Sequence, residues 1–160
     1  MGFFNIVGAR IEGARFLDLF AGSGVFSFEA VSRGASSSTA IEQDRRSVAT
    51  ITRLAKEWDV PVTAIASDVF VEIPRLGNGF FDVIYADPPY ALGRYDELLA
   101  AIDRAVALPD AAIVAIEHQR RSEPFTIKTT RLKQTRRAEY GEVWITLFEV
   151  TQSRGLEVAR

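Results

Sequence analysis

Short apolar runs alternate with helical patterns along most of the chain. Each run predicts a buried β-strand, over residues 15–20, 39–42, 62–66, 81–86 and 111–117. Between the strands, apolar positions at helical spacing predict helices over residues 25–32, 45–58, 69–73 and 95–107. This alternation is typical of a parallel sheet with helices packed against it, and it excludes a β-sandwich or a helical bundle.

The remaining segments complete the predicted fold. Three apolar residues share one face of an N-terminal helix that Gly8 closes: Phe3, Phe4 and Val7. The serine tract 36–38 predicts a loop, and Pro74 predicts the end of the helix before it. Two β-rich segments beyond Pro124 predict an antiparallel hairpin, over 125–137 and 142–150, connected by 138–141. We therefore expect an α/β, Rossmann-like fold with a mostly parallel seven-stranded sheet that ends in a C-terminal antiparallel hairpin.

Composition narrows the picture further. The chain has 160 residues, 48% of them hydrophobic, which is enough for one domain over 1–150, followed by a loose tail over 151–160. No apolar run approaches a membrane span and no signal peptide is visible, so we expect a cytoplasmic protein without membrane contact. The absence of Cys and the single His argue against a metal site. The net charge of −2 lacks the overall basic balance typical of nucleic-acid binders, although basic residues concentrate in the last third.

Acidic and small residues follow several predicted strands. In such sheets ligands bind outside the carboxyl ends of the strands, and five candidate residues belong to that edge: Asp18, Gly22, Glu42, Asp68 and Asp87. Gly22 and Gly24 lack a Cβ and would let a ligand approach the backbone. A dinucleotide is disfavoured because Asp18 and the other acids would repel its pyrophosphate, and because Ser27 stands at the third small position of that fingerprint.

S-adenosylmethionine suits these acids better, because it carries no phosphate and has a sulfonium and an ammonium group. We expect Asp18, Gly22 and Gly24 to hold its methionine end. Glu42 would accept from the ribose hydroxyls, and Asp68 with Val69 would meet the adenine. The full predicted donor set is Asp18, Phe20, Ala21, Gly22, Ser23, Gly24, Glu42, Gln43, Asp68, Val69 and Asp87. The alternative is a Rossmann-like core in which acids such as Asp44 and Asp68 only cap helices.

The stretch Asp87-Pro88-Pro89-Tyr90 follows the fourth predicted strand and suggests chemistry on an amine. The two prolines impose an extended, rigid turn that presents the Asp87 carboxylate and the Pro88 carbonyl as acceptors. Two such acceptors would orient an exocyclic amine and aim its lone pair at a methyl group. The ring of Tyr90 would stack on a base taken out of its helix. We therefore interpret Asp87, Pro88, Pro89 and Tyr90 as the catalytic residues, which act by positioning.

Several motifs in register resemble one known family. They are 18–24 (Asp-Leu-Phe-Ala-Gly-Ser-Gly), 28–35, Ile41-Glu42, Asp87-Pro88-Pro89-Tyr90 and Tyr140-Gly141-Glu142. Together, from Phe3 to Phe148, they resemble the RsmD-type bacterial methyltransferases that modify guanine N2 in small-subunit (16S) ribosomal RNA. The resemblance implies a class I methyltransferase fold, S-adenosylmethionine as methyl donor, and ribosomal RNA or the small ribosomal subunit as partner. We expect a monomer.

The chain departs from that family in two places. Family members have a basic, β-rich N-terminal extension that helps hold RNA, whereas this sequence starts within the helix of Phe3. The family often has Phe where Tyr90 stands, but either ring can stack on a base. Two alternatives therefore remain open: an adenine-N6 DNA methyltransferase, whose usual large recognition insert is not visible here, and a catalytically idle donor-binding module.

Other residues have both a functional and a structural interpretation. Arg94, beside Tyr90, is predicted to bind a substrate phosphate, and His118 is a candidate substrate contact. Asn5 is a weaker candidate for donor or RNA contact. Trp58 and Trp144 are expected in the core. A basic group either tracks RNA phosphates or protects a solvated hairpin edge: Arg120, Arg121, Lys128, Arg131, Lys133, Arg136 and Arg137.

Overall fold

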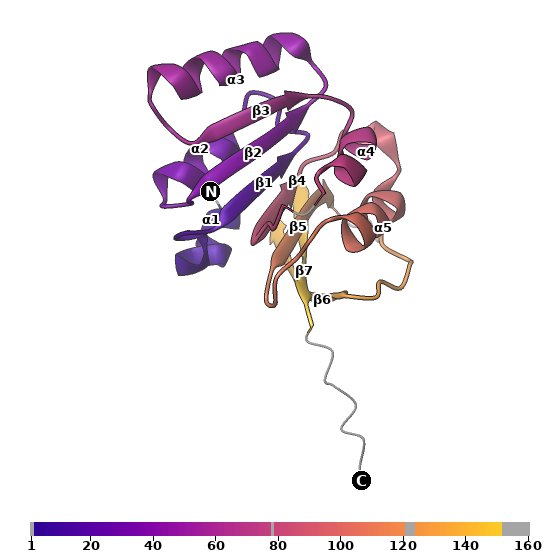
Figure 1. The fold of residues 1–160 in the computed structure, drawn as a ribbon. Helices are drawn as coiled ribbons and strands as arrows, with labels where there is room; N and C mark the ends of the chain where they lie inside the picture. The colour runs from indigo at the N-terminus through magenta and orange to yellow at the C-terminus, as the bar shows by residue number, and fades with distance from the viewer. Residues whose placement is uncertain (1, 78, 121–123, 152–160) are drawn as a thin grey trace.

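The structure, a computed structural model, describes residues 2–77, 79–120 and 124–151. Its strands form one sheet in the order β3-β2-β1-β4-β5-β7-β6 (Figure 1). The strands are β1 (Arg15–Leu19), β2 (Ser37–Glu42), β3 (Val62–Ala66), β4 (Val83–Ala86), β5 (Ile113–Gln119), β6 (Leu132–Tyr140) and β7 (Val143–Val150). The first five strands pair in parallel, whereas β7 is antiparallel to both β5 and β6. The predicted α/β fold with a C-terminal antiparallel hairpin is confirmed.

Helices cover both faces of the sheet. They are α1 (Gly2–Val7), α2 (Val25–Ser32), α3 (Arg45–Glu57), α4 (Val69–Glu72) and α5 (Tyr95–Ala105), with 3-10 turns η1 (Gly8–Ile11), η2 (Ile73–Arg75) and η3 (Tyr90–Leu92). Figure 1 shows α1, α2 and α3 on one side of the sheet and α4 and α5 on the other. None of the helices in the described ranges is long and apolar enough to cross a membrane.

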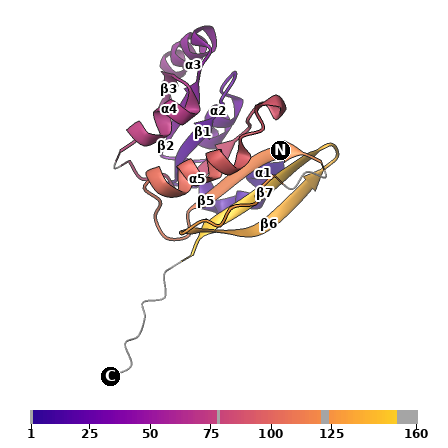
Figure 2. The ribbon, with the colours of Figure 1, turned by 90° about the vertical axis from the view of Figure 1, so that its right-hand side faces the viewer.

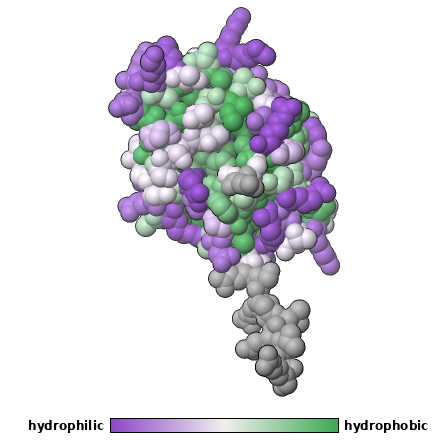
Figure 3. Space-filling model, viewed as in Figure 1, coloured by the Kyte–Doolittle hydropathy of each residue, from purple (hydrophilic) through white to green (hydrophobic). Residues whose placement is uncertain are grey.

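The core divides into layers because successive side chains of a strand point to opposite faces. Leu17 and Leu19 pack with the side chains of α4 and α5, whereas Phe16 packs with α1 and η1. A separate group under α3 contains Ile51 and Ala40. In the space-filling view, hydrophobic residues gather toward the middle of one face and hydrophilic ones lie mainly around its margin (Figure 3).

The β6–β7 hairpin forms one edge of the sheet (Figure 2). Its turn is shorter than predicted, because β6 runs to Tyr140 and β7 begins at Val143. The ring of Tyr140 lies against Gly2, where an added Cβ would overlap the ring atoms. The hairpin and the N-terminal helix α1 therefore lie side by side.

Several predicted boundaries are wrong. Ser37 and Ser38 belong to β2, because they pair with β1 across from Arg15 and Phe16. The hairpin begins at Leu132 and not at residue 125.

One predicted helix end shifts, because α4 ends at Glu72 and the chain continues in the 3-10 helix η2, where Pro74 lies near the start and is tolerated. The N-terminal α-helix ends at Val7 as predicted, and Gly8, with a φ of 55°, begins the 3-10 helix η1.

The prediction that both tryptophans lie in the core holds for one of them. Trp144 is buried as predicted, but Trp58 is 56% exposed, so its assignment to the core is wrong. Trp58 follows the last residue of α3, where only the edge of its ring reaches Phe28, with ring centroids 5.0 Å apart. Of the predicted loose tail, only Thr151 lies within the described residues, and its amide donates to the carbonyl of Arg131.

Candidate functional site

The ends of β1 and β4 bring the two predicted loops together. Leu19 and Ala86 are partners in the parallel register, and the Asp87 amide donates to the Leu19 carbonyl at 3.3 Å. The next residues, Phe20 and Asp87, therefore begin neighbouring loops at one edge of the sheet. Both line the same hollow.

This first hollow, the β1–β3 hollow, has a volume of about 130 Å³. It is lined by Phe20, Glu42, Gln43, Ser67, Asp68, Val69, Asp87 and Pro89. Among these described lining residues there are three carboxylates and neither Lys nor Arg. These carboxylates suit a ligand that offers polar hydrogens and positive charge, and they would repel a pyrophosphate.

The loop after β1 adopts an unusual backbone. Phe20, Gly22 and Gly24 all have positive φ values, of 60°, 55° and 80°. A Cβ on Gly24 would meet Cγ1 of Ile51 at 2.8 Å, so this glycine permits packing against α3. A Cβ on Gly22 would meet nothing within 4 Å, so the space above Gly22 is open to a ligand. The prediction that glycine allows close approach therefore fits Gly22, whereas Gly24 has a packing role.

Glu42 ties this loop to the end of β2. One carboxylate oxygen accepts from the Gly22 amide at 2.7 Å, and the other accepts from the Asp44 amide at 2.9 Å. Each carboxylate oxygen can accept more than one hydrogen bond. Glu42 is thus held in place by the backbone and retains the capacity to accept from a ribose.

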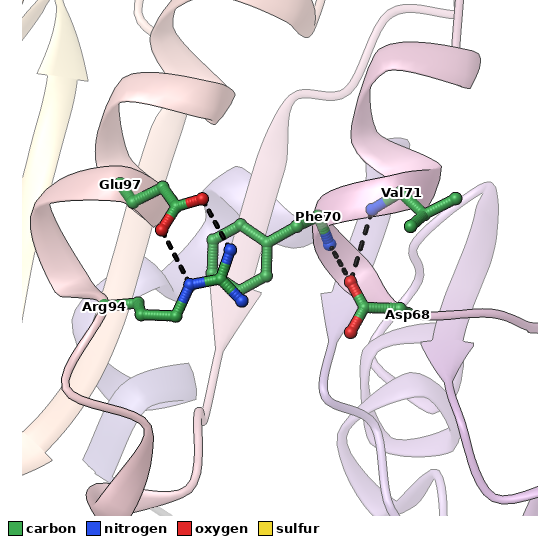
Figure 4. Close-up of polar contacts among 5 residues, drawn as sticks. All are labelled: Asp68, Phe70, Val71, Arg94 and Glu97. Carbon is green, nitrogen blue, oxygen red and sulfur yellow. Dashed lines mark hydrogen bonds and ion pairs between the residues drawn. The ribbon is translucent and has the colours of Figure 1, made fainter.

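Asp68 caps α4 and also borders the β1–β3 hollow (Figure 4). Its Oδ1 accepts from the amides of Phe70 and Val71, at 2.8 and 3.3 Å. The cap that was considered as an alternative is therefore present. Because both bonds use Oδ1, Oδ2 remains available to a ligand amine.

Arg94 joins the loop after Tyr90 to α4. Its guanidinium lies 3.7 Å from the ring centroid of Phe70, and its Nε donates to Glu97 at 2.6 Å (Figure 4). The bond to Glu97 raises the pKa of Arg94. Phe70 in turn packs edge-on against Phe20 of the β1–β3 hollow. Arg94 therefore links the loop after Tyr90 to α4. Its contact with a substrate phosphate remains a prediction.

Asp18 lies beneath the loop, away from the residues that line the hollow. It is 2% exposed, and its Oδ2 accepts from the hydroxyl and the amide of Ser27, at 2.8 and 3.1 Å. Burial raises the pKa of Asp18 to about 7. In this structure Asp18 fixes the start of α2, and contact with the methionine end of a donor remains a prediction.

Ser23 also faces elsewhere. It lines a groove between α2 and α3 together with Val25, Phe28 and Trp58. Ala21 belongs to the loop backbone, where its amide donates to the Ile41 carbonyl at 3.0 Å. Of the residues predicted to bind the methyl donor, some line the β1–β3 hollow, and others hold the surrounding backbone or lie elsewhere.

A second hollow, the β4–β5 hollow, adjoins the first. It has a volume of about 320 Å³ and is lined by Asp87, Pro88, Pro89, Tyr90 and Glu117. Asp87 and Pro89 line both hollows. Tyr90 is 42% exposed, so its ring is accessible to a planar partner.

The surroundings of Asp87 shift its pKa. Its side chain reaches solvent, yet the surrounding protein and the negative charge of Glu117 raise its pKa to about 6. A carboxylate held among other carboxylates favours the approach of hydrogen-bond donors and positive charge. The site therefore has the electrostatics of an amine-binding pocket.

Glu117 is a site residue that the sequence reasoning missed. It follows the last residue of β5 that pairs with β4 and lies beside Asp87, since Ala86 and Ile116 are partners in the register, and β5 runs two residues further than predicted, to Gln119. The hydroxyl of Tyr85 donates to Glu117. The signal was available, because Glu117 is an acid at the carboxyl end of a strand, as Glu42 is.

His118 is not placed to contact a substrate, which corrects the prediction. It is 1% exposed, and its Nε2 lies 2.7 Å from Oγ1 of Thr146. Its ring packs edge-on against Tyr95 and Phe125. Because successive side chains alternate along β5, His118 faces the α5 side while Glu117 faces the opposite one.

The basic residues of the last third have mixed roles. Arg131 donates to carbonyls at the end of α5, including that of Val106 at 2.9 Å, and so anchors the loop before β6. Arg120 pairs with Glu142, and the Arg137 guanidinium lies 4.1 Å from the ring centroid of Trp144. Arg121 lies outside the described residues. No group of residues that would hold a metal ion occurs in the described ranges.

Comparisons with known proteins agree with one another. The family described as Conserved hypothetical protein 95 matches residues 1–149. The Bacillus subtilis protein named Putative rRNA methyltransferase YlbH is 30% identical over 152 residues, covering 91% of this chain and 81% of its own. Ribosomal RNA small subunit methyltransferase D of Escherichia coli is 31% identical over 117 residues, covering 72% of this chain and 59% of its own.

A solved structure has a similar fold. A conserved hypothetical protein of Streptococcus pyogenes superposes with a TM-score of 0.82 at 28% identity, and 94% of each chain is covered. The fold described above is therefore shared with that protein. The chain spans less than two thirds of the length of the Escherichia coli relative.

Proposed function

Since the chain belongs to the family described as Conserved hypothetical protein 95, the RsmD-type rRNA methyltransferases, we propose that it methylates N2 of a guanine in small-subunit (16S) ribosomal RNA. By family and fold it is a class I, S-adenosylmethionine-dependent methyltransferase. One observation carries the proposal: the β1–β3 and β4–β5 hollows share Asp87 and Pro89. A donor in one hollow and a base in the other would thus meet at a single carboxylate.

The β1–β3 hollow fits the adenosine part of the donor. Glu42 would accept from the ribose hydroxyls, and Oδ2 of Asp68 would accept from the adenine amine. Phe20 and Val69 would pack against the adenine ring. S-adenosylmethionine supplies a methyl group on a sulfonium sulfur, which becomes a neutral thioether as the carbon bonds to the target nitrogen.

The β4–β5 hollow fits the target base. The Asp87 carboxylate and the Pro88 carbonyl would accept from the two N2 hydrogens and turn the nitrogen lone pair toward the donor. Tyr90 would stack on the base plane. N2 loses one proton as it gains the methyl group, and Asp87, with a pKa of about 6, can accept that proton. Orientation and desolvation supply the catalysis, and no covalent intermediate is needed.

The proposed substrate is ribosomal RNA, either free or within the small subunit, and the proposed working form is a cytoplasmic monomer. To test this, the protein is incubated with tritium-labelled donor and with bulk RNA, small subunits or DNA. The products are then digested to nucleosides. We expect N2-methylguanosine from 16S ribosomal RNA.

Other outcomes would replace the proposal. N6-methyladenine from DNA would establish the adenine-N6 alternative. Donor binding by calorimetry without transfer to any of these substrates would establish an idle donor-binding module. Failure to bind the donor at micromolar concentration would overturn the cofactor assignment for this chain.

A further inference from the structure

Glu117 has no part in the donor site, yet its carboxylate is held at the wall of the β4–β5 hollow. It lies in β5 on the same face of the sheet as Tyr85, one strand away from Asp87. Neighbouring strands lie about 4.8 Å apart, so two carboxylates flank the place proposed for the base. Asp87 and the Pro88 carbonyl are sufficient to orient one amine. The second carboxylate therefore needs its own explanation.

The orientation of Glu117 is fixed from below. The Tyr85 hydroxyl donates to it, and the Tyr85 ring is stacked on Phe26 with centroids 4.1 Å apart and an interplanar angle of 7°. Tyr85 also contacts Phe3, at 4.8 Å between ring centroids. A carboxylate oxygen held by so rigid a donor keeps its remaining acceptor capacity aimed in a constant direction.

We propose that Glu117 reads the guanine by accepting a hydrogen bond from N1–H, and this inference rests on the proposed function. Guanine presents N1–H and the N2 amine side by side on its Watson–Crick edge, which is the edge that enzymes read in an extruded base. An ionised carboxylate only accepts hydrogen bonds. Adenine presents an acceptor at N1. The Glu117 carboxylate and adenine N1 would then be two acceptors with no hydrogen between them, which disfavours adenine.

The test uses a change in specificity, which a structural role would not produce. The target RNA is prepared with either guanine or 2-aminopurine at the methylated position. 2-Aminopurine keeps the exocyclic 2-amine but has an acceptor at N1. We expect the wild-type protein to prefer guanine by about 10- to 100-fold in kcat/KM, the value of one good charged hydrogen bond.

The Glu117→Gln variant should lose or reverse that preference. Its amide oxygen can still accept from the Tyr85 hydroxyl, while its amide nitrogen can donate to N1 of 2-aminopurine. Tyr85→Phe is the matched control, because it removes the hydrogen bond that holds Glu117 but leaves the carboxylate in place. This control should lower both rates and keep the preference for guanine. Donor affinity should stay within a few-fold in both variants.

An unchanged guanine preference in Glu117→Gln would overturn the inference and leave the proposed function intact. Equal wild-type rates on the two bases would overturn it as well. If the wild-type protein modified adenine instead, the proposed function itself would fail. The three results are distinguishable in one set of reactions.

Discussion

The β1–β3 hollow and the β4–β5 hollow adjoin at one edge of the sheet, yet their acidic residues are held in different ways. In the β1–β3 hollow, Glu42 and Asp68 already accept hydrogen bonds from backbone amides. In the β4–β5 hollow, the pKa of Asp87 is raised to about 6 and the Tyr90 ring is exposed. The first hollow is preorganised by the chain itself. In the second hollow the Tyr85 hydroxyl donates to Glu117, whereas Asp87 would gain hydrogen-bond donors from a substrate.

This difference predicts that Asp87 affects chemistry far more than donor binding. Asp87→Ala removes the acceptor that orients the amine, and we expect a loss of about 1,000-fold or more in methyl transfer. Donor affinity, measured by calorimetry, should stay within a few-fold. Asp82→Ala, at the other end of β4, is the matched control and should transfer normally. A fully active Asp87→Ala variant would remove the proposed role.

Glu42 should show the opposite behaviour. Glu42→Ala removes the shared acceptor of two loop amides and the proposed ribose ligand, so we expect donor affinity to fall by about 10- to 100-fold. The rate at saturating donor should fall far less. Calorimetry with the donor and single-turnover rates separate the two effects. A variant that binds normally but transfers slowly would place Glu42 in the chemical step.

The pKa of Asp87 predicts a pH profile. The carboxylate accepts hydrogen bonds only when ionised, so kcat/KM should fall about tenfold per unit as the pH drops below about 6. Asp18, with a pKa of about 7, titrates nearby. Measuring the profile in Asp18→Asn as well distinguishes the two groups. A flat profile between pH 5 and 8 in the wild-type protein would contradict the assignment.

Arg94 should give the smallest effect, because it is exposed and already paired with Glu97. If it binds a phosphate, Arg94→Ala should raise the KM for RNA a few-fold and reduce the salt slope of RNA binding by about one. Arg94→Lys keeps the charge and should retain most of the slope. A change confined to the KM of the donor would mean that Arg94 acts through Phe70.

The sequence predicted the edge of the sheet better than it predicted individual contacts. Alternating strands and helices determine where strands end, so Asp87 and Glu42 could be assigned to one edge from sequence order alone. Which way a side chain faces depends on register with a distant strand. His118 and Glu117 are adjacent in sequence, and only the pairing of β4 with β5 shows that Glu117 meets Tyr85.

Local propensity was overridden where tertiary contacts supplied better partners. Ser37 and Ser38 favour a loop by composition, but both pair with β1, and the Ser38 amide donates to the Pro61 carbonyl at 2.9 Å on the other side. Trp58 has the composition of a core residue, but it follows the end of α3, beyond the positions that the sheet covers. In both cases the position in the sheet decided the outcome.

Packed aromatic rings connect the N-terminal helix to the edge of the sheet where the two hollows lie. Phe3 of α1 touches Tyr85, and Tyr85 holds Glu117, so the first helix is coupled to the mouth of the β4–β5 hollow through a single ring. A tilt of α1 would be transmitted to the carboxylate without any intervening loop to absorb it. A macromolecule that contacts the outside of α1 would thereby also adjust the direction in which Glu117 points.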